Sequence, residues 1–286
     1  MKFAYFGSST VSIYVLEELE KAGFVPTCIV TTPDKHKGRG LVLTPNVVKE
    51  WGLRKKIPVL DPATLDATFE KSLRNFDCVL FIVAAYGKIM PRGIIEMPQK
   101  KTLNVHPSLL PLYRGASPLP SVILADDKNT GISIMRLDEK MDHGPVVAQK
   151  KITVNEWPVY EVFEEMMARE GGRLLAEILP DWMAGKIPEQ EQDHERATFT
   201  KKIVKEDALI DFTEDSYLNF RKIQAYHEWP QAYFFVTKGG RQLRVKITEA
   251  SYSGKILTIE KVIPEGSKEM PFADFCSGYN FKLPQK

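Results

Sequence analysis

The sequence contains few cysteines, and they form no recognisable pattern. Its 286 residues include only Cys28, Cys78 and Cys276, an odd number at wide spacing. Cys28 and Cys78 lie within apolar segments, as small core residues do, and no two cysteines have the spacing of a metal site. We therefore expect no disulfide framework and no metal, and we expect a reducing, cytoplasmic location.

Signals for membranes and export are lacking as well. No run of about 18 apolar residues occurs in the sequence, so no transmembrane span is expected. The first residues, MKFAYFG, lack the long apolar region and the cleavage site of a signal peptide. The net charge of +2 is close to zero, so any binding of nucleic acid must depend on local basic segments.

The first half of the chain alternates short apolar segments with amphipathic ones. Residues 10–22, for example, carry Val11, Val15, Leu16 and Leu19 at helical spacing. Strands that alternate with helices predict a doubly wound α/β fold, with a mostly parallel sheet covered on both faces. The predicted strands are residues 2–6, 25–30, 58–60, 78–84, 102–105, 131–138 and 146–154, and a helix is predicted at 161–184.

A polar segment at residues 187–204 predicts a linker. It would separate a catalytic domain, residues 1–186, from a smaller domain at 205–286. The smaller domain is predicted to be β-rich. Its predicted elements are a helix at 215–225 and β-like segments at 232–236, 243–251 and 256–262.

Asn104 and His106 stand at the end of a predicted strand. Residues two apart in a strand share a face, and Pro107 ends the strand directly after them. An amide can donate to a developing oxyanion and an imidazole can take or return a proton, which suits attack on an acyl carbon. Spacing alone nevertheless favours a structural histidine before a turn, with the asparagine in a cap.

Acidic residues follow the strand predicted at 131–138. Asp138 and Asp142 lie in a loop that ends in glycine. A carboxylate near His106 would orient the ring and favour its cationic form. Read alone, this segment fits a solvated acidic turn. The sequence has no nucleophile elbow, no His-Glu-x-x-His motif and no Walker loop.

The two segments together resemble a known family. NVHPSLLP at 104–111 and YRGASP at 113–118 resemble the signature of 10-formyltetrahydrofolate-dependent formyltransferases, and residues 138–144 are similar to that family's second signature. The resemblance implies a Rossmann-like sheet with a C-terminal OB-like barrel. It also implies that Asn104 stabilises the oxyanion, that His106 assists proton transfer as an amine attacks the formyl carbon, and that Asp142 orients His106.

The resemblance further implies how the formyl donor, 10-formyltetrahydrofolate, is bound. VAAYGKIMP at 83–91 is similar to the family loop whose backbone contacts the pterin. The acidic loop from Asp138 would close the pterin pocket from the other side. The residues expected to contact the substrates are Ser108, Leu109, Leu110, Pro111, Arg114, Ala84, Ala85, Tyr86, Gly87, Ile89 and Asp138.

A basic segment indicates the acceptor. TPDKHKGRG at 32–40, with LTPNVVK at 43–49, is similar to a loop that inserts at the acceptor stem in the tRNA-dependent branch of the family. Cations among glycines suit phosphate contacts from a mobile segment. The resemblance implies transfer to methionine esterified to initiator tRNA. The residues expected to bind tRNA are Lys35, Lys37, Arg39, Lys238, Arg241 and Arg244.

The C-terminal domain departs from the family pattern. Only residues 251–255 separate two predicted strands where family members carry a longer hairpin region, so the OB-like barrel is expected to be shortened. Two other functions stay open. One is a sugar-nucleotide N-formyltransferase with the same donor, which would not need the basic loop. The other is a folate- or tRNA-binding protein without turnover. Nothing in the sequence demands more than a monomer.

Overall fold

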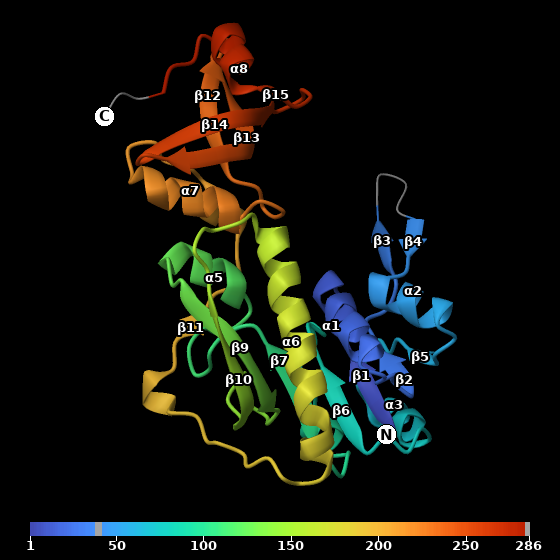
Figure 1. Cartoon of the computed structure of the whole chain (residues 1–286). Helices are drawn as coiled ribbons and strands as arrows, with labels where there is room; N and C mark the ends of the chain where they lie inside the picture. The colour runs from blue at the N-terminus through green and yellow to red at the C-terminus, as the bar shows by residue number, and fades with distance from the viewer. Residues whose placement is uncertain (38–41, 284–286) are drawn as a thin grey trace. The chain divides into compact units, whose positions relative to one another are not determined.

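The computed structural model of the chain describes residues 1–37 and 42–283 (Figure 1). The chain forms two compact units, each built from three stretches of sequence. The first unit comprises Met1–Gly115, Thr130–Ile152 and Glu164–Phe199, and the remainder is the second unit. The predicted boundary therefore differs from the observed division. Most of the predicted linker belongs to the first unit, because its backbone is hydrogen-bonded there at Gln190 and Thr198.

A seven-stranded sheet in the order β10-β9-β7-β6-β1-β2-β5 forms the centre of the first unit. β1 (Phe3–Phe6) runs parallel to its two neighbours, β2 (Cys28–Val30) and β6 (Leu80–Val83). β5 (Val59–Leu60) extends the sheet beyond β2, and β7 (Thr102–His106) extends it beyond β6, both in parallel. The winding reverses between β1 and β6, and ligands of such sheets bind beyond the carboxyl ends of the strands near this point.

The sheet is mostly parallel, as predicted, but it has an antiparallel side. β9 (Asn129–Arg136) pairs antiparallel with β7, so His106 lies opposite Ser133. β10 (Val146–Thr153) forms the edge beyond β9. The sequence pattern indicated both strands but not their direction, because alternation of apolar residues is the same in either direction.

Helices cover both faces of this sheet. α3 (Ala67–Arg74) and α4 (Arg92–Ile95) share one buried cluster with β1, β2 and β6. The opposite face carries α1 (Thr10–Lys21), α2 (Val47–Arg54) and the part of α6 (Tyr160–Met183) that belongs to the first unit. Figure 1 shows α1 and α6 side by side in front of the sheet.

Short polar side chains mark where several helices begin. Asn46 precedes α2, Asp66 precedes α3, and Asp215 precedes α7 (Ser216–Ala225). Each side chain accepts hydrogen bonds from backbone N–H groups of the first helical turn. These contacts satisfy N–H groups that have no partner inside the helix.

The second unit contains an antiparallel sheet in the order β12-β13-β14-β15. Its helices α7 and α8 pack on the apolar cluster of this sheet. An OB barrel has five strands, whereas this sheet has four, and no pairing of β12 with β15 closes it within the described residues. The elements are α5 (Pro118–Ala125), β12 (Tyr233–Lys238), β13 (Arg241–Ser253), β14 (Ile256–Pro264), β15 (Met270–Pro271) and α8 (Phe272–Tyr279).

The remaining elements are short. They are the hairpin β3 (Lys35–Lys37) with β4 (Val42–Thr44), the pair β8 (Arg114–Gly115) with β11 (Phe199–Thr200), and the 3-10 turns η1 (His194–Arg196) and η2 (Lys205–Ala208). Across residues 1–37 and 42–283, no helix has the length and apolar character needed to cross a bilayer.

Candidate active site

Asn104 and His106 lie two residues apart at the carboxyl end of β7, as predicted. Asn104 is opposite Val83 of β6 and Met135 of β9. Its half-buried side chain makes no hydrogen bond to any residue that the structure describes. The amide group of Asn104 is therefore available to a ligand.

His106 is almost completely buried, with an exposed fraction of 4%. Nε2 lies 3.2 Å from the carbonyl oxygen of Tyr113, and Nδ1 lies 3.7 Å from Oδ1 of Asp142. Burial lowers the pKa of His106 below its ordinary value, and Arg114 acts in the same direction, whereas Asp142 and the Tyr113 carbonyl oppose them. Asp142 thus favours the cationic form, as expected, but burial outweighs this effect, so the net shift of the pKa is downward.

Asp142 reaches His106 from the loop that follows β9. Its other oxygen, Oδ2, accepts a hydrogen bond of 2.8 Å from the backbone N–H of Gly115. The loop is packed tightly against the end of β9, because a Cβ atom on Gly144 would lie 2.0 Å from the carbonyl oxygen of Arg136. Asp142 itself has a φ of 49°, a conformation that costs energy for residues other than glycine. The surrounding contacts must hold it.

The segment after His106 is held from within the first unit. Ser108 is fully buried and donates to the carbonyl oxygen of Leu112 at 2.6 Å. Ser133 donates to the carbonyl oxygen of Ser108 and accepts from the N–H of Leu110. The hydroxyl of Ser108 is thus occupied within the protein, and the contact of Ser108 with a substrate stays a prediction. Leu110 is also buried, in an apolar cluster, while Leu109 and Pro111 are half-buried.

Arg114 is buried too, with an exposed fraction of 3%. Its guanidinium donates to Oε1 of Gln192 at 2.6 and 3.1 Å and lies 2.9 Å from Nδ1 of His194. These protein groups surround the charge of Arg114, and its contact with a substrate stays a prediction.

The predicted donor loop at residues 84–89 follows β6 at the reversal of winding. Ser8 donates to the carbonyl oxygens of Ala85 and Tyr86, and Ser12 donates to that of Ala84. Positive φ angles at Ala85 (48°) and Gly87 (76°) turn the chain at this point. Ser8 of the β1–α1 turn and Ser12 of the first turn of α1 therefore set the shape of the loop.

Side chains of this loop differ sharply in exposure. Ile89 is 87% exposed, whereas Tyr86 is 2% exposed. The hydroxyl of Tyr86 has no hydrogen-bond partner among the described residues, and burial raises its pKa to about 12. Ile89 can contact a ligand directly, while Tyr86 acts through the core beneath the loop.

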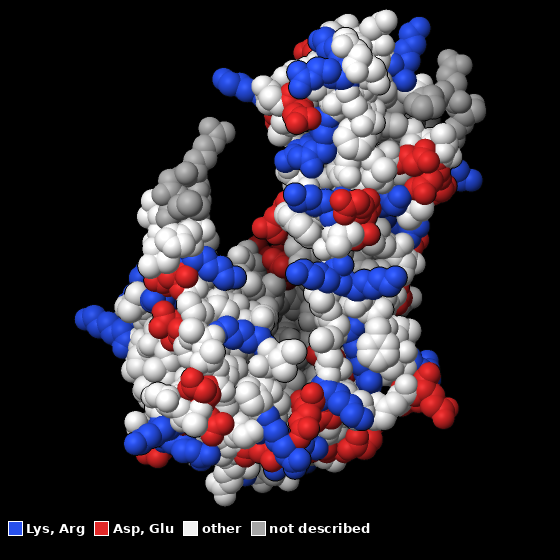
Figure 2. All heavy atoms as spheres, turned by 180° about the vertical axis from the view of Figure 1, so that it is seen from behind, with Lys and Arg blue, Asp and Glu red and all other residues white. Residues whose placement is uncertain are grey.

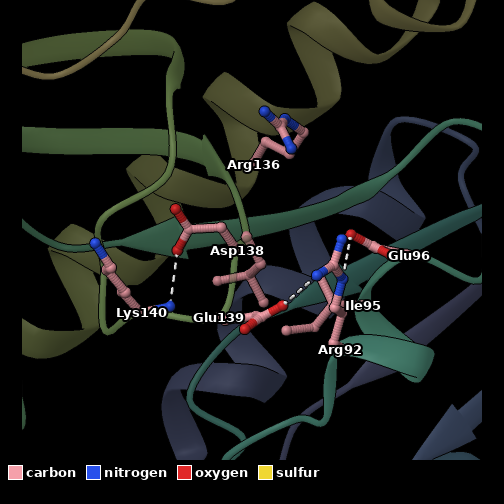
Figure 3. A pocket seen from close by; sticks show the side chains of 8 residues that line it. Arg92, Ile95, Glu96, Arg136, Asp138, Glu139 and Lys140 are labelled. Atoms are coloured by element: carbon pink, nitrogen blue, oxygen red, sulfur yellow. Dashed lines mark hydrogen bonds and ion pairs between the residues drawn. The ribbon is translucent and has the colours of Figure 1, made fainter.

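A small pocket lies between α4 and the loop after β9 (Figure 3). Its volume is about 280 Å³. Arg92 crosses it, at 3.1 Å from Glu139 and 3.0 Å from Glu96. Asp138, which was predicted to contact the formyl donor, lines the pocket. Its carboxylate accepts a hydrogen bond from the backbone N–H of Lys140. The lining residues are Arg92, Ile95, Glu96, Arg136, Leu137, Asp138, Glu139 and Lys140.

Sequence reasoning missed three side chains around this centre. Gln192 and His194 come from the predicted linker, and His143 follows Asp142. The rings of His143 and His194 stack with centroids 4.0 Å apart, and Nδ1 of His143 lies 2.7 Å from Asp138. A segment without periodic apolar residues carries no local signal of such contacts. Within the described residues, no group of three or more His, Cys, Asp or Glu side chains could hold a metal ion. The expected absence of a metal stays a prediction.

The residues predicted to bind tRNA lie in both units. Lys35 is exposed on the hairpin of β3 and β4, Lys37 ends β3, and Arg39 lies outside the described residues. The base of the hairpin is anchored by Lys49, whose Nζ is 2.8 Å from Asp34. The described residues on each side, Lys35–Lys37 and Val42–Thr44, therefore pair as two short antiparallel strands.

In the second unit, the predicted cations lie on β12 and β13. Lys238 is paired with Arg241 in the sheet, and its Nζ lies 3.9 Å from the centre of the Tyr279 ring. Arg244 lies over the ring of Tyr233. Figure 2 shows basic and acidic side chains interspersed on the face in view rather than one area of a single sign. A basic binding surface on this face is therefore a local one.

Comparison with known proteins identifies the family. The family model described as formyl transferase matches residues 1–179, and the model of the formyl transferase C-terminal domain matches residues 202–255. The chain belongs to the formyltransferase family. A methionyl-tRNA formyltransferase from Chloroflexus aggregans is 40% identical to this formyltransferase over 246 residues, which cover 86% of the chain and 79% of that relative.

Solved structures of other formyltransferases share the fold. A methionyl-tRNA formyltransferase from Clostridium thermocellum matches with a TM-score of 0.62 and 15% identity, covering 92% of this chain and 98% of that one. An N-formyltransferase from Helicobacter canadensis, in complex with folinic acid and dTDP-3-aminofucose, matches with a TM-score of 0.66 and 16% identity over 88% of each chain. At such identities the likeness establishes the fold alone.

Proposed function

We propose that this formyltransferase moves the formyl group of 10-formyltetrahydrofolate onto the amino group of methionine esterified to initiator tRNA. The product is N-formylmethionyl-tRNA for translation initiation. The observation that carries the proposal is the identity with the Chloroflexus enzyme over most of both chains. The sugar N-formyltransferase is only 16% identical to this chain. That likeness supports a shared fold, but it does not support an amino sugar as the acceptor of this chain.

Asn104 is the oxyanion donor in this proposal. Attack of the amine on the formyl carbon places negative charge on the formyl oxygen. The unpaired amide of Asn104, at the carboxyl end of β7, can donate to that oxygen without first breaking a contact to the described residues. The side chain is held on a central strand, so little reorganisation is needed during the reaction.

His106 takes the proton that the attacking amine loses, and returns a proton to the departing nitrogen of tetrahydrofolate. Its lowered pKa keeps the imidazole neutral and ready to accept. A neutral imidazole has one N–H, yet both ring nitrogens face oxygen atoms of the protein, those of Tyr113 and Asp142. Proton uptake therefore gives each of these oxygens an N–H to face, which favours the transient cation.

The donor is held at the carboxyl ends of β6 and β7. We propose that its pterin group lies in the pocket between α4 and the loop after β9, which Asp138 lines. The family resemblance implies further contacts from the backbone of residues 84–87. Carboxylates and exposed backbone groups match the amino and amide groups of a pterin. In this arrangement Ile89 and Leu109 contact the donor, whereas Ser108, Leu110 and Arg114 hold the protein itself.

The acceptor is bound by local basic residues. We assign phosphate contacts to Lys35 and Lys37 of the hairpin, to Arg39, and to Lys238, Arg241 and Arg244 of the second unit. Phosphate contacts of this kind position a nucleic acid and make affinity depend on salt. A monomer suffices for this arrangement, and light scattering of the purified protein checks that state.

Formyl transfer by the purified chain tests the proposal directly. The enzyme is incubated with 10-formyltetrahydrofolate and either methionyl initiator tRNA or a dTDP-linked amino sugar, and N-formylated product is measured in each case. We expect formylation of the charged tRNA and none of the sugar. Formylation of the sugar alone would replace the proposed acceptor. Binding of donor and tRNA without turnover would instead indicate a binding protein.

A further inference from the structure

A segment predicted as a linker runs alongside the active site of the first unit. Backbone hydrogen bonds in both directions join Gln190 to Val146 of β10, each 2.8 Å long. At the other end, the carbonyl oxygen of Thr198 accepts a hydrogen bond from the N–H of Arg114 at 2.9 Å. The hydroxyl of Thr198 accepts one from the N–H of Tyr113 at 2.8 Å. The segment is therefore fixed on both sides of Gln192.

The side chain of Gln192 is buried, with an exposed fraction of 7%. Its Nε2 donates to the carbonyl oxygens of Asp142 at 2.9 Å and Gly144 at 2.6 Å. Its Oε1 accepts from Nε of Arg114 at 3.1 Å and from Nη2 at 2.6 Å. The orientation of the amide is unambiguous, because a guanidinium only donates and a carbonyl only accepts.

These four hydrogen bonds join the two loops that enclose His106. The first loop supplies the Asp142 carboxylate to Nδ1, and the second supplies the Tyr113 carbonyl to Nε2. The N–H of Gly115, which follows Arg114, also holds Oδ2 of Asp142. The side chain of Gln192 thus connects the backbone of Asp142 to Arg114, the residue that precedes Gly115.

We propose that Gln192 is a positioning residue for the formyl transfer, acting by fixing the Asp142 loop against Arg114 so that the carboxylate faces His106. The inference rests on the proposed function of His106 and Asp142. Asp142 requires such support, because its φ of 49° is unfavourable without contacts that hold it. His194 supports the same guanidinium from the side, at 2.9 Å from Nη2.

Two variants of Gln192 and two matched controls test this role. Gln192→Met removes all four hydrogen bonds without adding charge, and Gln192→Glu keeps an acceptor for Arg114 but loses the donors. Gln190→Met and Gln190→Glu make the same changes two residues away, where the side chain is exposed and has no partner among the described residues. Thermal denaturation first establishes which variants are folded.

We expect both Gln192 variants to lose about 10–100-fold in kcat, because a displacement of about 1 Å in a reacting group has an effect of this size. KM for the donor and for charged tRNA should stay within about threefold, since no substrate contact is removed. The Gln190 variants should match the wild type. Folded Gln192 variants with normal kcat, or with raised KM and unchanged kcat, would overturn the proposal. Unfolding of both would assign Gln192 to stability alone and overturn it as well.

The charge state of His106 supplies a readout that needs no acceptor. Its charged neighbours are Asp142 and Arg114. If Asp142 moves away in Gln192→Met, His106 loses a negative neighbour, and its titration, followed by imidazole NMR signals, should shift to lower pH than in Gln190→Met. An unchanged titration would contradict the positioning role. A shift in a protein whose wild type fails to formylate charged tRNA would overturn the proposed function and leave the role of Gln192 in holding Asp142 intact.

Discussion

Oδ2 of Asp142 accepts a hydrogen bond of 2.8 Å from the N–H of Gly115, 27 positions earlier in the chain. This contact turns Oδ1 toward Nδ1 of His106, at 3.7 Å. The carboxylate is thus oriented by backbone on one side and faces the imidazole on the other. Replacing Asp142 by asparagine would remove the negative charge but keep an oxygen that accepts the hydrogen bond from Gly115. The effect of the charge can therefore be measured separately from the effect of the geometry.

Asp142→Asn should keep the fold and lose about 10²-fold in kcat, because the neutral amide no longer favours the protonated imidazole. Steady-state formylation of charged tRNA measures the loss. Asp127→Asn, in the turn after α5, is a control that removes a carboxylate elsewhere. An Asp142→Asn enzyme as fast as that control would show that the charge is not needed.

Asn104→Ala should reduce kcat by about 10²–10³-fold, since it removes a donor to the oxyanion. KM for both substrates should change little, because the contact forms mainly in the transition state. The exposed Asn155 offers a matched control, Asn155→Ala, which should be neutral. Near-normal turnover of Asn104→Ala would remove Asn104 from the mechanism.

The pH dependence follows from the lowered pKa of His106. In the folded protein the ring stays neutral at pH values where a free imidazole, with a pKa of about 6.5, is already charged. The rate should therefore hold constant from neutral pH to below 6.5 and fall only as the pH drops through the lower, folded value. The acid limb of kcat measures it, and a limb above 6.5 would contradict a buried neutral base.

The same shift affects stability. Because the unfolded chain binds a proton on His106 more readily than the folded protein does, this group disfavours folding increasingly as the pH falls below about 6.5. Its contribution is fully favourable above that value. His106→Gln should therefore flatten the acid side of the stability curve, measured by urea denaturation from pH 5 to 8.

Tyr86 and Tyr5 form a matched pair for the energetics of buried hydroxyls. The Tyr5 hydroxyl donates to the carbonyl oxygen of Ser12 at 2.8 Å, whereas the Tyr86 hydroxyl has no partner among the described residues. Tyr5→Phe should cost about 1 kcal/mol of unfolding free energy, and Tyr86→Phe should be neutral or stabilising. Equal losses in urea denaturation would imply that the Tyr86 hydroxyl has an unseen partner.

Basic residues of both units should contribute to tRNA affinity. Lys35→Ala and Arg241→Ala should each raise KM for charged tRNA but not for the donor, and lower the slope of log affinity against log salt by about 1. Lys71→Ala, on the exposed side of α3, is the control for loss of one charge. If the salt dependence of either variant equals that of Lys71→Ala, the substituted residue does not contact the tRNA.

The sequence by itself determined the pieces of this site that depend on local order. Alternation along β7 placed Asn104 and His106 on one face, and Pro107 marked its end. Apolar segments and helical spacing indicated the parallel sheet, and two short signatures indicated the family. These features depend on neighbours within a few residues, so they can be read without knowing the fold.

Only the tertiary structure decided what burial and distant contacts control. The pKa of His106 is lowered although Asp142 by itself raises it, because burial of the ring has the larger effect. Ser108 and Arg114 both belong to the first family signature, where substrate contacts were predicted, and yet their side chains are buried. Gln192 lies 50 residues from Asp142 in the chain and holds its carbonyl. The spacing of residues along the chain does not show how strongly a side chain is desolvated or which distant carbonyl an amide contacts. Both properties are set only when the chain folds.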